Sequence, residues 1–432
     1  MPARQRAAAV YIAYEAGNGF LFQLMAVPFS VFLILRIGLD PLQLVLMGTI
    51  LEATYLVFEV PTGVVADTVS RRLSVIVGLA GTGLAFVLLG FAGSFLVAAL
   101  SQVLWGVFAT FTSGADVAWL TDEVGEANAR SVYARADQGW HAAGLLGIAA
   151  AVGLASIDLR LPILVSGFGY AVLAVVMRFA MSEEGFTRPE RRDGERLYHG
   201  LARTLRAGGR AVRAHPVLLL ILATAALHGA STEGFDRLSD LHVLCDIRLP
   251  GVSGACGDGS FDVGFGLIVW FGLLDGVAML LGIAGLQVVK RIHLDGHSRG
   301  AQVLAMIDLS LIATVVLFAL VGEFWLAAGA FWLVGALRSV REPIFTAWIN
   351  QGLDPATRAT INSLGAQADA IGQAGGGPVL GLIARGASIP GAVVVSGLLR
   401  APALVLYAIA FRRGSVGTLP PEEMDEELEI EA

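Results

Sequence analysis

Long apolar runs separated by short polar segments make up most of the chain. The twelve runs are rich in Leu, Ala, Val and Gly, and they lie at roughly 8–36, 41–66, 73–93, 95–119, 134–157, 161–182, 216–242, 262–289, 300–322, 324–350, 359–385 and 389–412. A helix that crosses a bilayer needs about 20 mostly apolar residues, which is the length range of these runs. The strands of a membrane β-barrel would instead alternate apolar and polar residues over about ten positions. The pattern therefore predicts an all-α membrane protein with twelve transmembrane helices.

The composition agrees with a chain that is mostly surrounded by lipid. Of the 432 residues, 56 % are hydrophobic and only 15 % are charged, whereas a soluble domain has about 25 % charged residues. The first apolar run, from Ala8 to Leu35, is too long for the core of a signal peptide and is followed by further spans. We therefore expect it to be the first transmembrane helix.

Basic residues are distributed unevenly between the segments that join these helices. The side that holds both chain ends carries Arg4, Arg6, Arg71, Arg72, Arg130, Arg135, Lys290, Arg291, Arg299, Arg358, Arg412 and Arg413. The central loop, 183–215, adds eight arginines to that side, while the opposite side has only Arg36, Arg160, Arg248 and Arg385. Cytoplasmic loops of membrane proteins are enriched in Lys and Arg. We therefore expect a multi-pass protein of the inner (cytoplasmic) membrane with both termini in the cytoplasm.

The central loop divides the chain into two six-helix halves. We expect a first bundle at 1–182, a cytoplasmic linker at 183–215, a second bundle at 216–413 and an acidic cytoplasmic tail at 414–432. Within the linker, Leu197, Leu201 and Leu205 could line one face of a helix, with most of the arginines off that face. Such a helix would lie on the inner leaflet of the membrane. A merely solvated linker is the alternative.

Two segments that are 232 residues apart resemble each other. Ser131, Ala134, Ala136, Asp137, Ala142 and Gly144 recur as Ser363, Ala366, Ala368, Asp369, Ala374 and Gly376. The fourth and fifth helices therefore correspond to the tenth and eleventh, in the same orientation. Parallel halves related by an axis along the membrane normal are a transporter architecture, with the substrate site between them near the midplane of the bilayer.

A polar signature joins the second and third helices. It reads Gly63-Val-Val-Ala-Asp67-Thr-Val-Ser-Arg71-Arg72. It resembles the loop signature of the major facilitator superfamily, G-x-L-A-D-R-x-G-R-K/R, with Thr and Ser in place of one arginine and one glycine. The resemblance implies that Gly63, Asp67, Arg71 and Arg72 belong to a latch between the inner ends of the two halves in an outward-open state.

We group two further aspartates with this latch. Asp137 and Asp369 occupy equivalent places in the repeat, near the starts of the fifth and eleventh helices. A carboxylate is favoured at a helix N-terminus by the helix dipole, so a purely structural role is the alternative for both.

Three further segments resemble one branch of that superfamily. They are Phe58-Glu-Val-Pro-Thr-Gly63, Ser113-Gly-Ala-Asp-Val-Ala-Trp-Leu-Thr-Asp-Glu123 and Gly375-Gly-Gly-Pro378. Together they look like the drug:proton antiporters that include tetracycline and macrolide efflux proteins. The resemblance implies proton-coupled export of an amphipathic drug. Two marks of that branch are absent, because Gln102 replaces an arginine and Gly144-Leu-Leu-Gly147 replaces a Gly-Pro pattern. Import or exchange of a metabolite or lipid-like compound is the alternative.

Enzymatic and ATP-driven functions find no support in the sequence. A phosphate-binding loop ends in G-K-S/T, and Lys290, the only lysine, follows Val289. There is no H-E-x-x-H or G-x-S-x-G motif. We therefore expect a non-enzymatic monomer without metal or cofactor, whose partners are a small-molecule substrate, protons and the lipid bilayer, but not nucleic acid.

Several ionisable residues fall inside the predicted spans. Each costs roughly 2.5–3.5 kcal/mol at a helix centre on insertion scales, and is a functional candidate for that reason. Burial favours the protonated form of a carboxyl group, so that a lone carboxyl can exchange a proton near neutral pH. The candidates for proton coupling are Glu15, Glu52, Glu59, His228 and Asp275.

Other charged residues in the spans have potential partners. Glu233 with Arg237, and Arg338 with Glu342, are four residues apart, where opposite charges meet on a helix. Arg341 and Arg400 are candidates to pair with a carboxylate from another helix. These six residues form our predicted set of ion pairs in the cavity.

The two cysteines fall in one predicted external loop. Cys245 and Cys256 could close that loop with a disulfide in an oxidising compartment. Two free thiols are the alternative.

Overall fold

The computed structural model describes residues 3–187, 216–252, 265–289, 297–350 and 355–413. All regular elements among these residues are helices. They are α1 (Ala3–Val31), η1 (Phe32–Ile37), α2 (Pro41–Thr68), α3 (Arg71–Gly90), α4 (Phe95–Thr112), α5 (Ala115–Val124), α6 (Glu126–Ala155), α7 (Arg160–Ala180), α9 (Pro216–Cys245), α10 (Phe265–Val289), α11 (His297–Leu320), α12 (Phe324–Ile349), α13 (Pro355–Gly386), α14 (Ile389–Leu398) and α15 (Ala401–Arg413). Most of the expected linker helix and the whole acidic tail lie outside the described residues.

The predicted spans match these helices one for one. The first span is α1 continued by the π-helical turn η1, the fourth is α4 with α5, and the twelfth is α14 with α15. Within the described part of the chain, nine segments are long and apolar enough to cross a membrane. The spans formed by α9, α12 and α13 fall outside that set, and each contains charged side chains. The prediction of an all-helical twelve-span membrane protein is confirmed.

Local signals set where several helices begin and break. Asp40 caps α2 by accepting from the backbone N–H of Gln43, whose side chain accepts in turn from the backbone of Asp40, which is a capping box. Ser70 caps α3 in the same way through the N–H of Leu73. Gly114 separates α4 from α5 with a positive φ of 73°, a conformation that glycine adopts without steric cost.

The helices form two bundles with equivalent internal packing. In the first bundle (α1–α7), α1 packs on α6, α2 on α4 and α3 on α7. In the second bundle (α9–α15), α9 packs on α13, α10 on α12, and α11 on α14 and α15. Glycines bring the paired helices close: a Cβ at Gly147 would overlap the Phe20 carbonyl, and one at Gly372 would overlap the Ala226 carbonyl. The two bundles are therefore pseudo-symmetric, as the repeat predicts.

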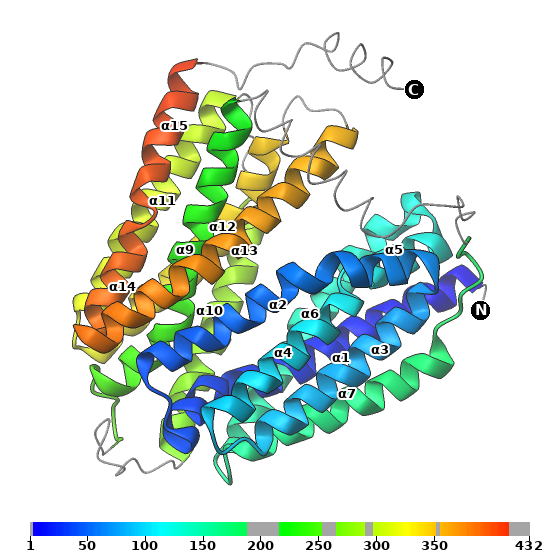
Figure 1. The fold of residues 1–432 in the computed structure, drawn as a ribbon, viewed down its shortest axis with the longest axis horizontal. Helices are drawn as coiled ribbons and strands as arrows, with labels where there is room; N and C mark the ends of the chain where they lie inside the picture. Colours follow the sequence, from blue (N-terminus) through cyan, green and yellow to red (C-terminus); the bar gives the residue numbers. More distant parts are fainter. Residues whose placement is uncertain (1–2, 188–215, 253–264, 290–296, 351–354, 414–432) are drawn as a thin grey trace.

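The two bundles meet at one end of the molecule and diverge at the other (Figure 1). We call the end that carries Ala3, the α2–α3 turn and Arg413 the termini end, and the opposite end the far end. Near the far end α2 packs on α13 and α6 on α10. Asp40 at the start of α2 lies 3.8 Å from Arg385 near the end of α13.

The exposure of α2 changes along its length in agreement with this divergence. From Pro41 to Glu52 the helix has no exposed residue. Beyond that point Leu56 and Phe58 are 37 % exposed and Val57 is 63 % exposed. The second bundle therefore packs against the half of α2 that lies at the far end, and the half at the termini end is more exposed.

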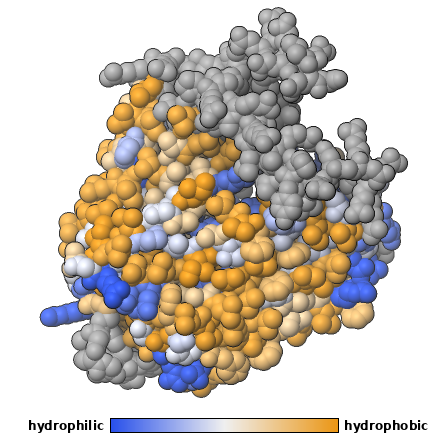
Figure 2. Space-filling view, in the orientation of Figure 1, coloured by the Kyte–Doolittle hydropathy of each residue, from blue (hydrophilic) through white to orange (hydrophobic). Residues whose placement is uncertain are grey.

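The surface is suited to lipid. In the face shown in Figure 2, apolar side chains cover most of the helices, and hydrophilic ones gather mainly near the helix ends. Leu96 at 76 % exposure and Phe179 at 77 % are among the apolar residues that point outward. A soluble monomer rarely exposes such a continuous apolar surface.

Candidate functional site

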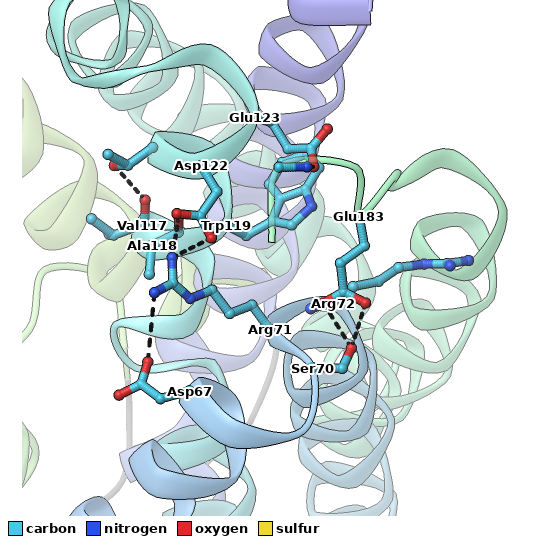
Figure 3. Close-up of polar contacts among 12 residues, drawn as sticks. Asp67, Ser70, Arg71, Arg72, Val117, Ala118, Trp119, Asp122, Glu123 and Glu183 are labelled. Atoms are coloured by element: carbon cyan, nitrogen blue, oxygen red, sulfur yellow. Dashed lines mark hydrogen bonds and ion pairs between the residues drawn. The ribbon is translucent and has the colours of Figure 1, made fainter. Parts of the chain in front are cut away.

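Arg71 at the start of α3 is the centre of a polar network at the termini end (Figure 3). It forms an ion pair with Asp122 on α5 and donates to the Ala118 carbonyl at 2.9 Å. Its other nitrogen lies 3.7 Å from Asp67, one helical turn earlier. The side chains of Arg71 and Asp122 are 21 % and 25 % exposed, whereas that of Asp67 is 65 % exposed. The better-buried partner of Arg71 is therefore Asp122.

The chain that follows α7 is tied into the same network. Glu183 accepts from the Ser70 hydroxyl at 2.7 and 2.8 Å and from the backbone N–H of Arg72 at 3.0 Å. Glu123 on α5 accepts from the Ser182 hydroxyl at 2.7 Å and from the backbone N–H of Gly185 at 2.8 Å. These bonds join the start of α3, the end of α5 and the segment after α7, as Figure 3 shows.

Of the predicted latch residues, Asp67, Arg71 and Arg72 lie in this network, whereas Asp137 and Asp369 have other partners. Among the described residues, the side-chain partners of Asp67 and Arg71 all belong to the first bundle. In the part of the chain that the structure describes, neither residue contacts the second bundle, as the latch implied by the family signature would require. A Cβ at Gly63 would meet no atom within 4 Å, in keeping with the open termini end. In the sequence Asp122 appears only within the family-like segment 113–123, and no local spacing pairs it with Arg71, which lies 51 residues away.

A second charged group lies where the bundles touch. Glu233 and Arg237 on α9 are 3.2 Å apart, as their spacing predicted. Glu233 is only 1 % exposed, and a Cβ added to Gly48 on α2 would overlap both its carboxylate and the Arg237 guanidinium. Glu52, one turn further along α2, lies within electrostatic range of both groups. The Glu233–Arg237 ion pair of the second bundle therefore has a carboxyl group of the first bundle within electrostatic range.

The second bundle contains a fully buried network that the sequence did not reveal. Asp308 on α11, 1 % exposed, accepts from Arg341 on α12 at 2.8 Å and from Arg400 at 3.2 Å. Arg400 lies between α14 and α15, and its Nε also donates to the Ser231 hydroxyl at 2.9 Å. The hydroxyl of Tyr407 on α15 donates to the second carboxylate oxygen of Asp308 at 3.0 Å. Arg341 and Arg400 do pair with a carboxylate from another helix, which is Asp308 and not one of the proton-coupling candidates.

The predicted pair of Arg338 with Glu342 is wrong. Arg338 instead forms an ion pair with Asp236 on α9 and lies over the Phe235 ring, with its guanidinium carbon 5.3 Å from the ring centroid. Glu342 is 65 % exposed and lies 3.8 Å from Arg341. The physical reason is that α9 presents both a carboxylate and an aromatic face to Arg338, which together outweigh one exposed partner on the same helix.

Among the described residues of the second bundle, three polar side chains keep a buried atom without a hydrogen bond. They are the Nδ1 atom of His228 on α9, the Oδ1 atom of Asp369 on α13 and the Oδ1 atom of Asn350 at the end of α12. The other oxygen of Asp369 accepts from the Gln373 amide at 2.7 Å. Its repeat counterpart Asp137 differs, because its side chain is 65 % exposed and lies 3.6 Å from His141.

The remaining coupling candidates lie in separate places. Glu15 on α1 is near Asp116 on α5, which accepts from the Tyr14 hydroxyl at 3.4 Å. Asp275 on α10 lies near Asp240 on α9, close to the contact of the two bundles. Glu59 on α2 is exposed at the open end. Glu59 also lies within electrostatic range of Glu52, two turns earlier on the same helix. The structure thus does not bring the five candidates together at one site.

Cys245 at the end of α9 takes part in a disulfide bond. Its expected partner Cys256 lies outside the described residues, so the predicted pairing of these two residues stays a prediction.

Comparisons with known proteins agree with this architecture. Residues 15–274, more than half of the chain, match the family model of the Major Facilitator Superfamily. The chain is 22 % identical over 408 residues to the uncharacterized MFS-type transporter YxaM of Bacillus subtilis (strain 168), with 93 % of this chain and 95 % of that protein covered.

Solved transporter structures share the fold. A bacterial homologue of the human lysosomal transporter Spinster, in an inward-facing conformation, has a TM-score of 0.72 at 15 % identity, covering 96 % of this chain and 98 % of its own. The nucleoside transporter NupG has a TM-score of 0.72 at 10 % identity, covering 95 % of this chain and 100 % of its own. A mutant of the peptide transporter POT has a TM-score of 0.71 at 15 % identity, covering 95 % of each chain. The match of the family model over more than half of the chain, on a twelve-span fold, shows that this protein belongs to the Major Facilitator Superfamily and is a multi-pass membrane transporter, not an enzyme.

Proposed function

We propose that the protein exports an amphipathic small molecule, tetracycline-like or macrolide-like, in exchange for protons. The observation that carries the proposal is the position of Glu52. This glutamate of the first bundle lies within electrostatic range of the Glu233–Arg237 pair of the second. A carboxyl group at the contact between two moving bundles is placed to link its protonation to their movement.

The charge balance at this contact favours the binding of one proton. Glu233 is paired with the guanidinium of Arg237, and Glu52 lies within electrostatic range of both groups. With both carboxyl groups ionised the group has one excess negative charge in a poorly solvated place, and a proton on either one removes it. Protonation also weakens the hold of Arg237 on one carboxylate. The proton state therefore sets how strongly α9 and α2 attract each other.

The same proposal assigns a direction to the open end. With both termini in the cytoplasm of the inner membrane, the divergence of the bundles at the termini end makes this an inward-open state. Arg71 then rests on Asp122 within the first bundle. In the outward-open state the two halves close at this end, and the latch at Asp67 and Arg71 engages the second bundle. A monomer suffices for this cycle.

Import or exchange of a metabolite is the alternative on the same fold. It is favoured by Gln102, which stands where the drug antiporters have an arginine. It is also favoured by the structural neighbours, which include a nucleoside transporter and a peptide transporter. In that case the carboxyl group of Glu52 would couple the entry of a proton to the uptake of the metabolite, both moving into the cell.

Proton movement in liposomes containing the purified protein separates these functions. The liposomes enclose a pH-sensitive dye, and tetracycline, erythromycin, nucleosides or dipeptides are added outside. We expect proton flux with the drugs and none with the metabolites. The variant Glu52→Gln should lose this flux and elute as a monodisperse species, while Glu126→Gln, at the exposed start of α6, should retain it. Flux with metabolites alone would support the alternative, and wild-type drug-linked flux in Glu52→Gln would refute the coupling role.

A further inference from the structure

The wall of the second bundle that faces the centre of the molecule carries an unbalanced set of charges. Arg341 and Arg400 share the single carboxylate Asp308 inside this bundle. Two further carboxylates, Glu342 and Asp369, act electrostatically on each other. With all three carboxyl groups ionised, they stand against two arginines, so that one negative charge is left without a compensating cation among the described residues of this group. The neighbouring Arg338 does not change the balance, because it is paired with Asp236.

Two hydrogen-bonding atoms beside these charges point to a ligand. The Oδ1 atom of Asp369 and the Nδ1 atom of His228 are buried and have no hydrogen-bond partner among the described residues. A buried polar atom without a partner costs free energy of about 1–3 kcal/mol, so a site with two of them gains from a donor that reaches both. A carboxylate oxygen accepts hydrogen bonds, and one nitrogen of a neutral imidazole does so too.

The two atoms come from helices that are in direct contact. A Cβ at Gly229, next to His228, would overlap the backbone carbonyl of Asp369, so α9 and α13 lie backbone to backbone at this level. His228 and Asp369 are both within electrostatic range of Arg341 and Arg400. The side chains of His228 and Asp369 therefore belong to adjacent, tightly packed helices and lie around the same pair of arginines.

The same wall is accessible from the space between the bundles. Glu342 is 65 % exposed, and Asp369 lies within electrostatic range of Glu52 on the opposite bundle. The site therefore lies near the centre of the molecule, between the two halves, where a transporter of this architecture binds its cargo.

We propose that the cargo carries a protonated amine, which binds to Asp369 and Glu342 with His228 as an additional acceptor. An ammonium group supplies the missing positive charge and up to three N–H donors. The rest of the cargo extends into the space between the bundles. This inference rests on the proposed function as a transporter of amphipathic molecules, and it narrows that class to organic cations.

Arg341 and Arg400 do not take the place of the cargo amine at Asp369 and Glu342. Arg341 and Arg400 are 1 % and 3 % exposed and are held by Asp308, Tyr407 and Ser231. Their hydrogen bonds go to these buried groups, and Arg341 also lies 3.8 Å from Glu342, so the two arginines lower the local negative potential but donate no hydrogen bond to Asp369 among the described contacts. One carboxylate charge remains for a ligand, which is enough to hold a monocation and too little to hold it irreversibly.

Equilibrium binding of three matched fluorescent probes tests the proposal. The full-length protein in nanodiscs is titrated with dansylcadaverine, whose tail ends in an ammonium group, with a dansylamide of similar tail length that ends in a methyl group, and with one that ends in a carboxylate. We expect the ammonium probe to bind about tenfold or more tightly than the neutral probe, because it gains a charge-assisted hydrogen bond. The carboxylate probe should bind more weakly than the neutral one.

Variants locate the site. Asp369→Asn and Glu342→Gln should each reduce the preference for the ammonium probe about tenfold and leave the affinity of the neutral probe unchanged. Glu126→Gln should change neither affinity. Testing two separate carboxylates guards against the misfolding of one variant. Equal affinities of the three probes in the wild type, or an unchanged preference in both variants, would overturn the proposal.

The result is distinguishable from the test of the proposed function. Binding without a gradient does not depend on proton coupling, and Glu52 is not one of the proposed amine ligands, so Glu52→Gln should still bind the ammonium probe more tightly than the neutral one. Loss of proton flux in Glu52→Gln with no preference for the ammonium probe in the wild type would refute the amine site alone. The reverse pattern, with amine binding and no proton flux, would refute proton coupling alone.

Discussion

The carboxylate of Glu233 on α9 lies directly against Gly48 on α2. A Cβ atom at position 48 would overlap this carboxylate and the Arg237 guanidinium paired with it. An ion pair of one bundle therefore packs against bare backbone of the other. The contact between the bundles at the far end depends on a residue without a side chain at this position.

Gly48→Ala should weaken the contact between the bundles at the far end. The added methyl group would force the Glu233–Arg237 pair to move, at a cost of about 1–3 kcal/mol for an overpacked site. We expect the population to shift toward a state in which the far end is open. Spin-label distances between the far ends of α2 and α13 would measure this shift.

The matched control is Gly153→Ala on α6, where a Cβ would meet nothing within 4 Å. It should leave the distance distribution of the wild type unchanged. An unchanged distribution in Gly48→Ala would show that the ion pair yields without opening the contact.

Asp308→Asn should destabilise the second bundle strongly. It would leave Arg341 and Arg400 buried beside each other without their buried carboxylate, since Glu342, 3.8 Å from Arg341, is 65 % exposed. Loss of one partner from a buried ion pair costs about 3–5 kcal/mol. Thermal unfolding of the purified protein in detergent would report a large fall in midpoint. Asp236→Asn removes an ion pair whose carboxylate is 48 % exposed and should have a much smaller effect. Similar midpoints for the two variants would contradict the structural role assigned to Asp308.

The comparison of these two aspartates also shows how far sequence reasoning reaches. The twelve spans could be predicted because the length of an apolar run is a local property. The Glu233–Arg237 pair could be predicted too, since both residues lie on one helix face. The same spacing failed for Arg338, because Asp236 on a neighbouring helix competes for it, and no spacing along one helix reveals such a competitor.

Asp308 could be noticed but not interpreted from the sequence. It lies near the middle of the ninth predicted span, where the reasoning applied to Glu52 would have selected it. Its arginine partners are 33 and 92 residues further along the chain. Only the packing of α11 against α12 and α15 brings them together, so its role as their partner is a tertiary property.

Arg71 and Asp122 should be energetically coupled, whereas Arg71 and Asp67 should not. The side chains of the first pair are about one-quarter exposed or less, and the guanidinium also donates to the Ala118 carbonyl at 2.9 Å. A double-mutant cycle with Arg71→Gln and Asp122→Asn should give a coupling energy of about 1 kcal/mol. The corresponding cycle with Asp67→Asn should give a value close to zero in this state, since that carboxylate is 65 % exposed at 3.7 Å. A larger coupling energy for Arg71 with Asp67 than for Arg71 with Asp122 would show that Asp67 is the main partner of Arg71.

Gly63→Leu should spare the fold and stop the transport cycle. In the state seen here a Cβ at Gly63 meets no atom within 4 Å, and the half of α2 that carries it is open on the side that faces the second bundle. A bulky side chain therefore fits without loss of stability, and the thermal midpoint should equal that of the wild type. In the opposite state the two halves close at this end, and the added side chain would then stand between them. We expect spin-label distances across the termini end to remain long under conditions that close the wild type, with no drug-linked proton flux.

Gly153→Leu, on an exposed position of α6 near the far end, is the control for adding a large apolar side chain. Wild-type transport by Gly63→Leu would mean that the halves close without bringing α2 close to the second bundle at this position.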